Sequence, residues 1–169
     1  MLVKTFGSAV YGVEAITITI EVNWLKSGKE STLVGLPDNA VKESLQRIES
    51  TFKSNEYEMP RTKVVVNLAP ADIRKSGTAF DLPIALGLLA AMGVIPRDSL
   101  AGYVVLGELA LDGALSRVPG VLPAAVAAMA AGRGLICPAA CGSEAALSGL
   151  GAGDADADRP AILAAPSLL

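Results

Sequence analysis

The chain has 169 residues, of which 51% are hydrophobic, 18% charged and 4% aromatic, with a formal net charge of −3. This composition supports a packed domain, excludes a disordered chain, and argues against an aromatic stacking surface for single-stranded nucleic acid. The chain has no histidine, which excludes Ser-His-Asp and Cys-His catalysis and histidine-ligated metal sites. The first 100 residues carry eleven basic and eleven acidic side chains, so no basic face typical of a stand-alone DNA-binding domain is expected.

Strict alternation of apolar and polar residues predicts a β-strand over residues 15–24, with isoleucine and valine on one face and mostly threonine, glutamate and asparagine on the other. Residues 3–10 are a weaker strand candidate. Residues 26–29 are predicted to form a turn, after which residues 31–35 return as a second strand. The start of the chain is therefore predicted to form strands with one buried face.

A helix is predicted after Leu36-Pro37, with Asp38 or Asn39 as its cap. Its apolar side chains recur at intervals of four, three and four residues between positions 41 and 52, which is the spacing of one helix face. The charged residues of this stretch lie off that face and are predicted to point to solvent: Lys42, Glu43, Arg47, Glu49 and Lys53.

Apolar runs alternate with loops through the middle of the chain. Residues 63–68 are predicted to form a central strand, followed by a polar loop over 69–78 and an apolar helix over 80–92. Further predicted elements are a strand at 103–106, a hairpin at 108–118 around Asp112-Gly113, a helix at 119–132 and a strand at 134–137. Strands come first and then alternate with helices, which predicts an α+β or mixed α/β fold.

The composition changes near residue 148. Residues 1–148 are predicted to form the domain, and the Gly-, Ala- and Asp-rich residues 149–160 a linker or insertion. Residues 161–169 are apolar again, so we expect the chain to be part of a longer protein. No signal sequence or membrane-spanning segment is predicted, which indicates a cytoplasmic location.

Three short patterns resemble known binding sites but lack required residues. Cys137 and Cys141 cannot complete a tetrahedral zinc site in a chain with no histidine or further cysteine, so they are predicted to be reduced and structural. Residues 7–12 have the glycine spacing of a P-loop, but valine and glutamate follow instead of lysine and a hydroxyl residue. The aspartates at 154–158 begin like a calcium loop but lack its glycine and its final glutamate.

The richest cluster of polar residues lies in Asn67–Pro83, and it gives a candidate functional loop of Asp72, Arg74, Lys75, Gly77 and Asp81. In the structural interpretation, Asp72 and Asp81 pair with Arg74 or Lys75 and cap the next helix. Two functional alternatives remain. The glycine loop before a helix could bind a small anion, or Lys75 could activate the hydroxyl of Ser76 or Thr78 as a Ser–Lys peptidase.

Four segments together resemble the N-terminal domain of the magnesium-chelatase-like AAA+ ATPases, the YifB/ComM competence-protein family: V-G-L-P-D-N-A-V-K-E-S (34–44), N-L-A-P-A-D-I-R-K-S-G-T-A-F-D-L-P-I-A (67–85), L-G-E-L-A-L-D-G (106–113) and C-P-A-A-C (137–141). The resemblance covers most of residues 1–148. It implies the fold of ribosomal protein S5 domain 2, which is shared with the Lon protease catalytic domain.

The resemblance also implies what lies outside this chain. In that family an AAA+ module follows the domain and binds ATP and Mg²⁺, and residues 161–169 resemble the segment that leads to it. The full-length protein is then expected to be a cytoplasmic homo-hexamer that acts on DNA as an ATP-driven helicase promoting branch migration in competence. The chain itself contains no Walker motif, and no catalytic residue, cofactor or metal is expected in it.

The likeness to Lon can be carried over residue by residue. Lon-type proteases use a serine nucleophile and a lysine, and the matching positions here are Ala79 and about Leu122. The resemblance therefore implies a protease-like fold without the catalytic dyad, and thus a non-catalytic accessory domain. The alternative is the residual peptidase in which Ser76 or Thr78 acts with Lys75.

Overall fold

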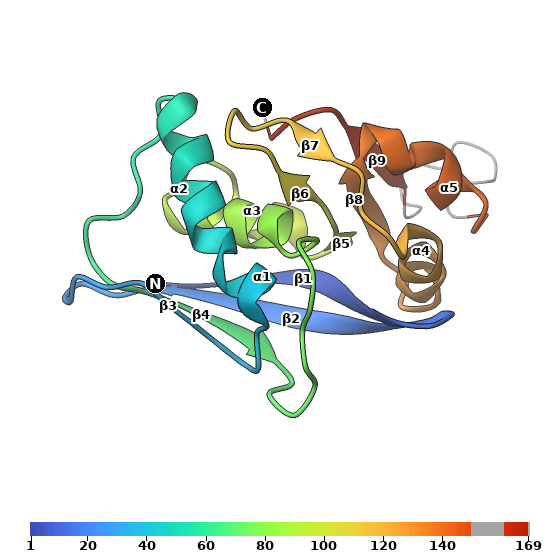
Figure 1. The fold of residues 1–169 in the computed structure, drawn as a ribbon, viewed down its shortest axis with the longest axis horizontal. Helices are drawn as coiled ribbons and strands as arrows, with labels where there is room; N and C mark the ends of the chain where they lie inside the picture. Colours follow the sequence, from blue (N-terminus) through green and yellow to red (C-terminus); the bar gives the residue numbers. More distant parts are fainter. Residues whose placement is uncertain (150–160, 169) are drawn as a thin grey trace.

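The computed structural model describes residues 1–149 and 161–168, which form three small sheets and five α-helices (Figure 1). The mixed α/β fold is confirmed. The strands are β1 (Leu2–Tyr11), β2 (Glu14–Trp24), β3 (Thr32–Val34), β4 (Val64–Ala69), β5 (Tyr103–Val105), β6 (Glu108–Leu109), β7 (Leu115–Ser116), β8 (Gly134–Pro138) and β9 (Ile162–Ala165). The α-helices are α1 (Asn39–Lys42), α2 (Ser44–Ser54), α3 (Asp81–Ala91), α4 (Val121–Ala130) and α5 (Gly142–Ala146), and Arg97–Leu100 and Ala139–Cys141 form 3₁₀ turns.

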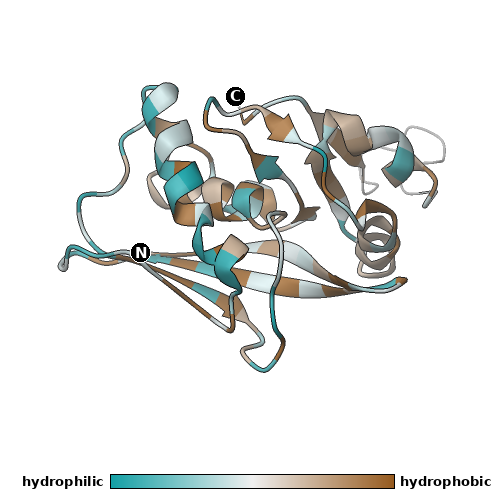
Figure 2. Ribbon diagram, in the orientation of Figure 1, coloured by the Kyte–Doolittle hydropathy of each residue, from teal (hydrophilic) through white to brown (hydrophobic). Residues whose placement is uncertain are grey.

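The largest sheet has the strand order β1-β2-β4-β3. The predicted alternation of β2 is confirmed, because Ile18, Ile20 and Val22 are fully buried and polar residues separate them along the strand (Figure 2). The strand predicted at 31–35 exists but does not return along β2. It pairs in parallel with β4 at the edge of the sheet, because β4 carries the more apolar run and occupies the buried position beside β2.

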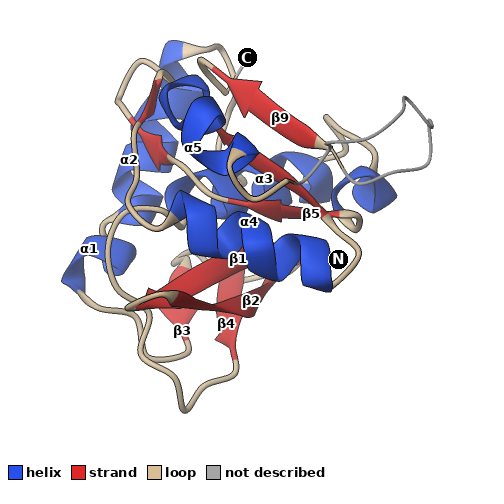
Figure 3. Cartoon of the chain, turned by 90° about the vertical axis from the view of Figure 1, so that its right-hand side faces the viewer, coloured by secondary structure: helices blue, strands red, loops and turns tan. Residues whose placement is uncertain are grey.

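The long β1–β2 ribbon contributes residues to two hydrophobic cores. The first core joins Ile20 of the ribbon to Leu88 of α3 and Phe52 of α2. Neighbouring residues of a strand point to opposite faces, so the ribbon also has side chains that do not face the first core. Phe6 of β1 is one of them, and it packs against the second core, which is built around α4 and β8. Figure 3 shows α4 lying in front of this ribbon. Both α3 and α4 are thus positioned by the same two strands.

The predicted helix over the segment that follows Leu36-Pro37 is divided into α1 and α2 at Glu43. Of the two predicted cap candidates, Asp38 caps α1, with Oδ1 accepting a hydrogen bond from the backbone N–H of Val41 (2.8 Å). The apolar face of α2 is buried through Ile48 and Phe52, as the spacing predicts. The other predicted helices and strands are present with slightly different ends.

The second sheet has the order β5-β8-β9, with all strands parallel. Residues 162–165, which we expected beyond the domain, pair with β8 along their whole length. The backbone N–H of Leu168 also donates to the carbonyl of Gly113 (2.9 Å). The apolar segment after residue 160 therefore belongs to the packed structure. The predicted linker and the aspartates at 154–158 lie outside the described residues.

Gly35, which follows β3, provides a test of the close approach of this segment to β4. Its φ is +102°, and a Cβ there would overlap the carbonyl oxygen of Leu68 in β4. We expect Gly35→Ala to lower the free energy of unfolding by about 3 kcal/mol or more, since it adds a backbone clash to an unfavourable φ. Urea unfolding measures the loss.

Gly12→Ala is the matched control. Its φ is +62°, but nothing lies within 4 Å of the added Cβ. The expected loss there is about 1 kcal/mol, from backbone conformation alone. Equal losses in the two variants would contradict the close approach of residue 35 to β4.

Candidate functional site

Asp81 is a fully buried carboxylate in the first turn of α3. Its Oδ1 accepts hydrogen bonds from Ser44 Oγ (2.6 Å) and Arg47 Nη2 (2.9 Å). Its Oδ2 accepts from Arg47 Nε (2.7 Å) and from the backbone N–H of Leu109 (3.1 Å). Four donors thus satisfy a charge that would be costly to bury alone. The network joins α2, α3 and β6.

This network corrects two predictions. Asp81 does not pair with Arg74 or Lys75, because Arg47 occupies its carboxylate. Arg47 does not point to solvent either: its side chain is only 19% exposed, and its hydrogen bond to Asp81 raises its pKa. Helical spacing places Arg47 off the apolar face, but it cannot show that a carboxylate 34 positions later in the chain will meet it. Arg47 and Ser44 were therefore missed as partners of Asp81.

Lys75 is fully buried, although the sequence suggested a reactive or ion-paired lysine. Its Nζ donates hydrogen bonds to the backbone carbonyls of Gly35 (2.8 Å) and Pro70. Burial lowers the pKa of Lys75, and the charge of Asp72 opposes this effect. The ammonium group therefore fastens the loop after β4 to the segment that follows β3.

The same two segments are also joined by backbone hydrogen bonds and by Asp38. The N–H of Lys75 donates to the carbonyl of Leu36 (3.0 Å), and the N–H of Asp38 donates to the carbonyl of Lys75 (2.9 Å). Asp38 Oδ2 accepts from the N–H of Gly77 (3.1 Å) while Oδ1 caps α1. Gly77 itself has a φ of +84°, which suits glycine at this bend. Asp38 thus has a second role that the capping signal did not reveal.

The candidate loop is consequently divided into buried and exposed residues. Lys75 and Asp81 are buried and engaged, whereas Asp72, Arg74 and Gly77 are exposed. Within residues 1–149 and 161–168, neither Asp72 nor Arg74 takes part in an ion pair. Only the exposed three are accessible to a partner.

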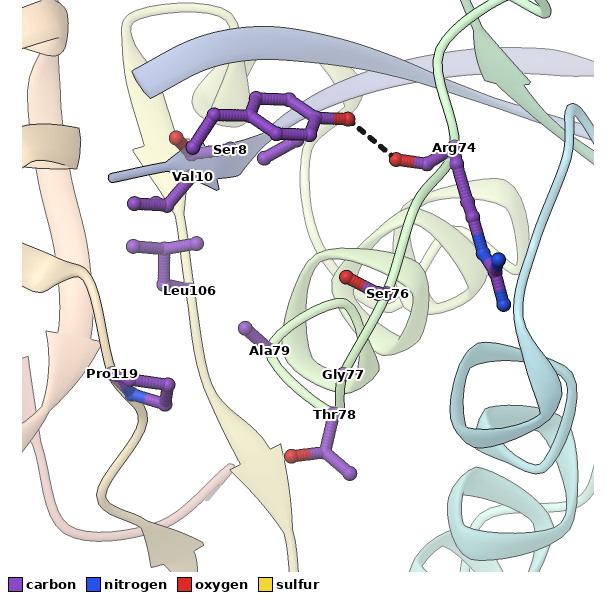
Figure 4. A pocket seen from close by; sticks show the side chains of 11 residues that line it. Ser8, Val10, Arg74, Ser76, Gly77, Thr78, Ala79, Leu106 and Pro119 are labelled. Carbon is purple, nitrogen blue, oxygen red and sulfur yellow. Dashed lines mark hydrogen bonds between the residues drawn. The ribbon is translucent and has the colours of Figure 1, made fainter. Parts of the chain in front are cut away.

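A cavity of about 300 Å³ lies between the end of β1 and the residues that precede α3. Figure 4 shows Ser76, Thr78 and Ala79 on one side of it, with Leu106 and Pro119 on the other. At its rim, Tyr11 donates a hydrogen bond to the backbone carbonyl of Arg74 (2.6 Å). Ser8 also lines the cavity, and its Oγ is the one buried side-chain polar atom without a partner in the part of the chain that the structure describes.

The contacts around this cavity do not favour a Ser–Lys peptidase. Ala79, at the nucleophile position that the Lon resemblance gives, carries no reactive atom. Thr78 Oγ1 donates to a carboxylate oxygen of Glu108, and the Nζ of Lys75 is held by two carbonyls. No lysine is among the described residues that line the cavity, and Leu122 lies in the first turn of α4. Among the described residues, Lys75 is thus engaged by carbonyls, which does not favour the pairing of a lysine with a free hydroxyl that the mechanism requires.

The start of α3 is also closed to an anion. The N–H of Asp81 donates to Thr78 O (3.2 Å), and the N–H of Leu82 donates to Gly107 O (3.0 Å). The next residue is Pro83, which has no N–H, and a carboxylate already sits in this turn. Anion binding at a helix start needs unpaired N–H groups, so this hypothesis loses its structural basis.

The two cysteines are free and buried, in agreement with the predicted structural role. Burial raises the pKa of Cys137 to about 11, so this thiol stays protonated at neutral pH and is a poor nucleophile. Among the described residues, no group of three or more His, Cys, Asp or Glu side chains is placed to hold a metal ion. None of the helices in these residues is long and apolar enough to cross a membrane.

Comparison with known proteins identifies the family. The family model described as subunit ChlI of Mg-chelatase matches residues 20–141. The chain belongs to this family. It is 46% identical to YifB of Salmonella typhimurium over 128 residues, which is 76% of this chain and 25% of the relative. It is 43% identical to the competence protein ComM of Haemophilus influenzae over 147 residues, which is 86% of this chain and 29% of the relative.

YifB of Escherichia coli is 45% identical over 128 residues, again 76% of this chain and 25% of the relative. The chain thus spans about a quarter of the length of these curated relatives. The ChlI-family match includes Arg47, Lys75 and Asp81, and it begins inside β2. The buried polar network therefore lies within the family region, whereas Tyr11 and the strand β9 lie outside it.

Removing the guanidinium from this ChlI-type domain should be strongly destabilising. Arg47→Met leaves the buried carboxylate of Asp81 without its cation, and we expect it to lower the free energy of unfolding by about 3–5 kcal/mol. Arg61→Met is the matched control, because Arg61 and Glu58 form an ion pair whose side chains are 86% and 79% exposed. That loss should be below about 1 kcal/mol in urea unfolding. Similar losses would contradict a buried, paired Asp81.

Lys75 should give the folded state a pH dependence. At neutral pH, Lys75→Met should lower the free energy of unfolding by about 1–3 kcal/mol, because two carbonyls lose their donor. The lowered pKa of the folded state means that the unfolded state binds more protons as pH approaches the ordinary value of 10.5. The stability of the wild type relative to Lys75→Met should therefore rise with pH through the window just below that value.

Urea unfolding of both proteins at matched pH values tests this, since other titrating groups cancel in the difference. Lys26→Met is the control at neutral pH, because Lys26 is exposed and its replacement should change stability by less than about 0.5 kcal/mol. If the free energy of unfolding of the wild type, relative to that of Lys75→Met, fell as the pH rose, the lysine would not be buried as described.

Proposed function

We propose that this chain is the non-catalytic N-terminal accessory domain of a ComM/YifB-like AAA+ ATPase. The observation that carries the proposal is the cavity beside α3. At the position where a Lon-type protease would hold its nucleophile stands Ala79, and among the described residues no lysine lines the cavity. A domain of this shape without the reacting groups is suited to binding or coupling.

The longer protein that would contain this domain, called the parent protein below, is proposed to supply the chemistry. Family membership and a relative named as a competence protein support this. So does length, because the matched relatives are several times longer than the region they share with this chain. The parent protein is proposed to bind ATP and Mg²⁺ in its AAA+ module, to form a cytoplasmic homo-hexamer, and to act as a helicase in DNA branch migration.

The domain's own task in this proposal is to couple the motor to another component. Its buried polar groups fix the loop after β4 at two points, through Lys75 and Asp38. Exposed side chains on that loop, Arg74 above all, are then presented on a firm backbone. Such a surface can transmit movement of an attached module because its backbone is held rigidly in place.

Deletion of residues 1–169 from the parent protein tests this role. We expect basal ATP hydrolysis to survive, since the Walker motifs lie elsewhere, and branch migration to fall by about tenfold or more because coupling is lost. ATP hydrolysis and branch migration are measured on the same DNA substrate. Ser76→Ala in the parent protein is the matched control and should leave both activities unchanged.

Two results would contradict the proposal. Unchanged branch migration after deletion would mean that the domain does not couple the motor to DNA. Loss of branch migration in Ser76→Ala would indicate chemistry at the cavity and would favour the peptidase alternative instead.

A further inference from the structure

A second hollow lies on the other side of Arg74 from the cavity. It has a volume of about 590 Å³ and is lined by Leu36, Pro37, Asp38, Asn39, Ala40, Lys42 and Arg74. Figure 4 shows the guanidinium of Arg74 directed away from Ala79 and Leu106. We call this surface, defined by those seven residues, the Arg74 hollow. The guanidinium of Arg74 therefore faces a different site, although Arg74 and Gly77 also contribute to the lining of the cavity.

Two cationic side chains line the Arg74 hollow without forming an ion pair among the described residues. They are Arg74 and Lys42, and both are exposed. The acidic groups nearby are already engaged or lie outside the lining. Both oxygens of Asp38 accept backbone N–H groups, and Glu43 pairs with Arg47 (3.6 Å). Asp72 is exposed on the same loop but does not line the hollow.

The hollow also exposes an apolar side chain on a strained backbone. Leu36 is 54% exposed and has a φ of +56°, a conformation that costs a non-glycine residue about 1 kcal/mol or more. Val34, just before it, is 44% exposed. Strain of this kind persists only where surrounding contacts impose it, and it is typical of sites that hold a ligand.

The contacts that impose the positive φ of Leu36 are those of Lys75. They hold the backbone on both sides of the hollow. The carbonyl of Leu36 accepts from the N–H of Lys75, and the carbonyl of Gly35 accepts from its Nζ. Tyr11 holds the carbonyl of Arg74 in turn. The backbone is fixed, while the side chains of Leu36, Lys42 and Arg74 remain free. A preorganised surface of this kind lowers the entropic cost of binding.

We infer that the Arg74 hollow binds an acidic, apolar peptide segment of a protein partner. A carboxylate of the segment lies between Arg74 and Lys42, and a neighbouring aliphatic side chain packs on Leu36. Charge complementarity carries this assignment, because a carboxylate matches a guanidinium in charge and planar geometry. The inference rests on the proposed function in one respect: it names the chemistry of the component to which the accessory domain is coupled.

A nucleic acid is a poorer match for the same surface. Phosphate-backbone binding draws its affinity from many cations, and this hollow supplies two, with Asp38 in its lining and Asp72 on the same loop. Among the residues that the structure describes, no aromatic side chain lines the hollow for a base to stack upon. A short peptide, in contrast, uses both the two cations and the exposed leucine.

Titration of the whole chain with two defined peptides tests the inference. The probes are N-acetyl-Leu-Asp-Leu-amide and the matched N-acetyl-Leu-Asn-Leu-amide, followed by NMR of the backbone N–H groups and of Arg74 Nε. The aspartyl peptide should give saturable shifts at Asn39, Lys42 and Gly77 in the millimolar range. The asparaginyl peptide should bind about fivefold more weakly or worse, because it lacks the charge.

Three variants separate the contributions of Arg74 and Leu36 to binding of the aspartyl peptide. Arg74→Gln should weaken binding of the aspartyl peptide by about fivefold, whereas Arg97→Gln, at an exposed arginine outside the hollow, should leave it unchanged. Leu36→Asn should also weaken it, and since asparagine tolerates a positive φ, the backbone should stay in place. An unchanged chemical-shift pattern elsewhere in each variant shows that the fold is intact.

Several outcomes would overturn the inference. They are the absence of saturable shifts at the hollow, equal binding of the two peptides, and no effect of Arg74→Gln. A single-stranded oligonucleotide that shifts the same N–H groups at lower concentration than the aspartyl peptide would assign the surface to nucleic acid instead. None of these results depends on branch migration by the parent protein, so failure here is distinguishable from failure of the proposed function.

Discussion

The position of α3 depends on one buried ion pair. A carboxylate in the first turn of that helix cannot lie in a hydrophobic core unless a cation and further donors reach it, and Arg47, Ser44 and the N–H of Leu109 meet that demand. The requirement fixes α2 and the β6 hairpin relative to α3. It thereby sets where the residues before α3 run, and so where the cavity and the loop on its rim are placed.

Two adjacent residues in that loop, Arg74 and Lys75, differ in their exposure to solvent. The Lys75 ammonium is withdrawn from water and bound by carbonyl oxygens, and the guanidinium of Arg74 remains in solvent. The extended backbone explains the difference, since successive side chains point to opposite sides of it. One cation is used to hold the loop together and the other is left available. As possible ion-pair partners of Asp72 and Asp81 the two cations were interchangeable in sequence, because both appear as charges in one polar stretch.

Local patterns were sufficient for much of the fold. The alternation in β2 and the apolar run of β4 each depend on neighbouring residues, and both were predicted correctly. The helix cap is equally local, and Asp38 was one of its two predicted candidates. The misses depend on residues far apart in the chain. The edge position of β3 is decided by competition with β4, and the partners of Asp81 and Lys75 are set by tertiary packing. For the candidate loop, the polar sequence could not show that Lys75 and Asp81 are buried while Asp72, Arg74 and Gly77 face solvent.

The pairing of β9 with β8 bears on how the chain acquires its structure during synthesis. Until residues 162–165 have been made, β8 offers an open parallel edge, and Ile162 is missing from the packing around α4. Open apolar edges invite pairing with other chains. The first core, which uses residues nearer the start, can be assembled almost entirely beforehand. The second half of the domain should therefore mature late, and a nascent chain that stalls before β9 is the form most exposed to aggregation.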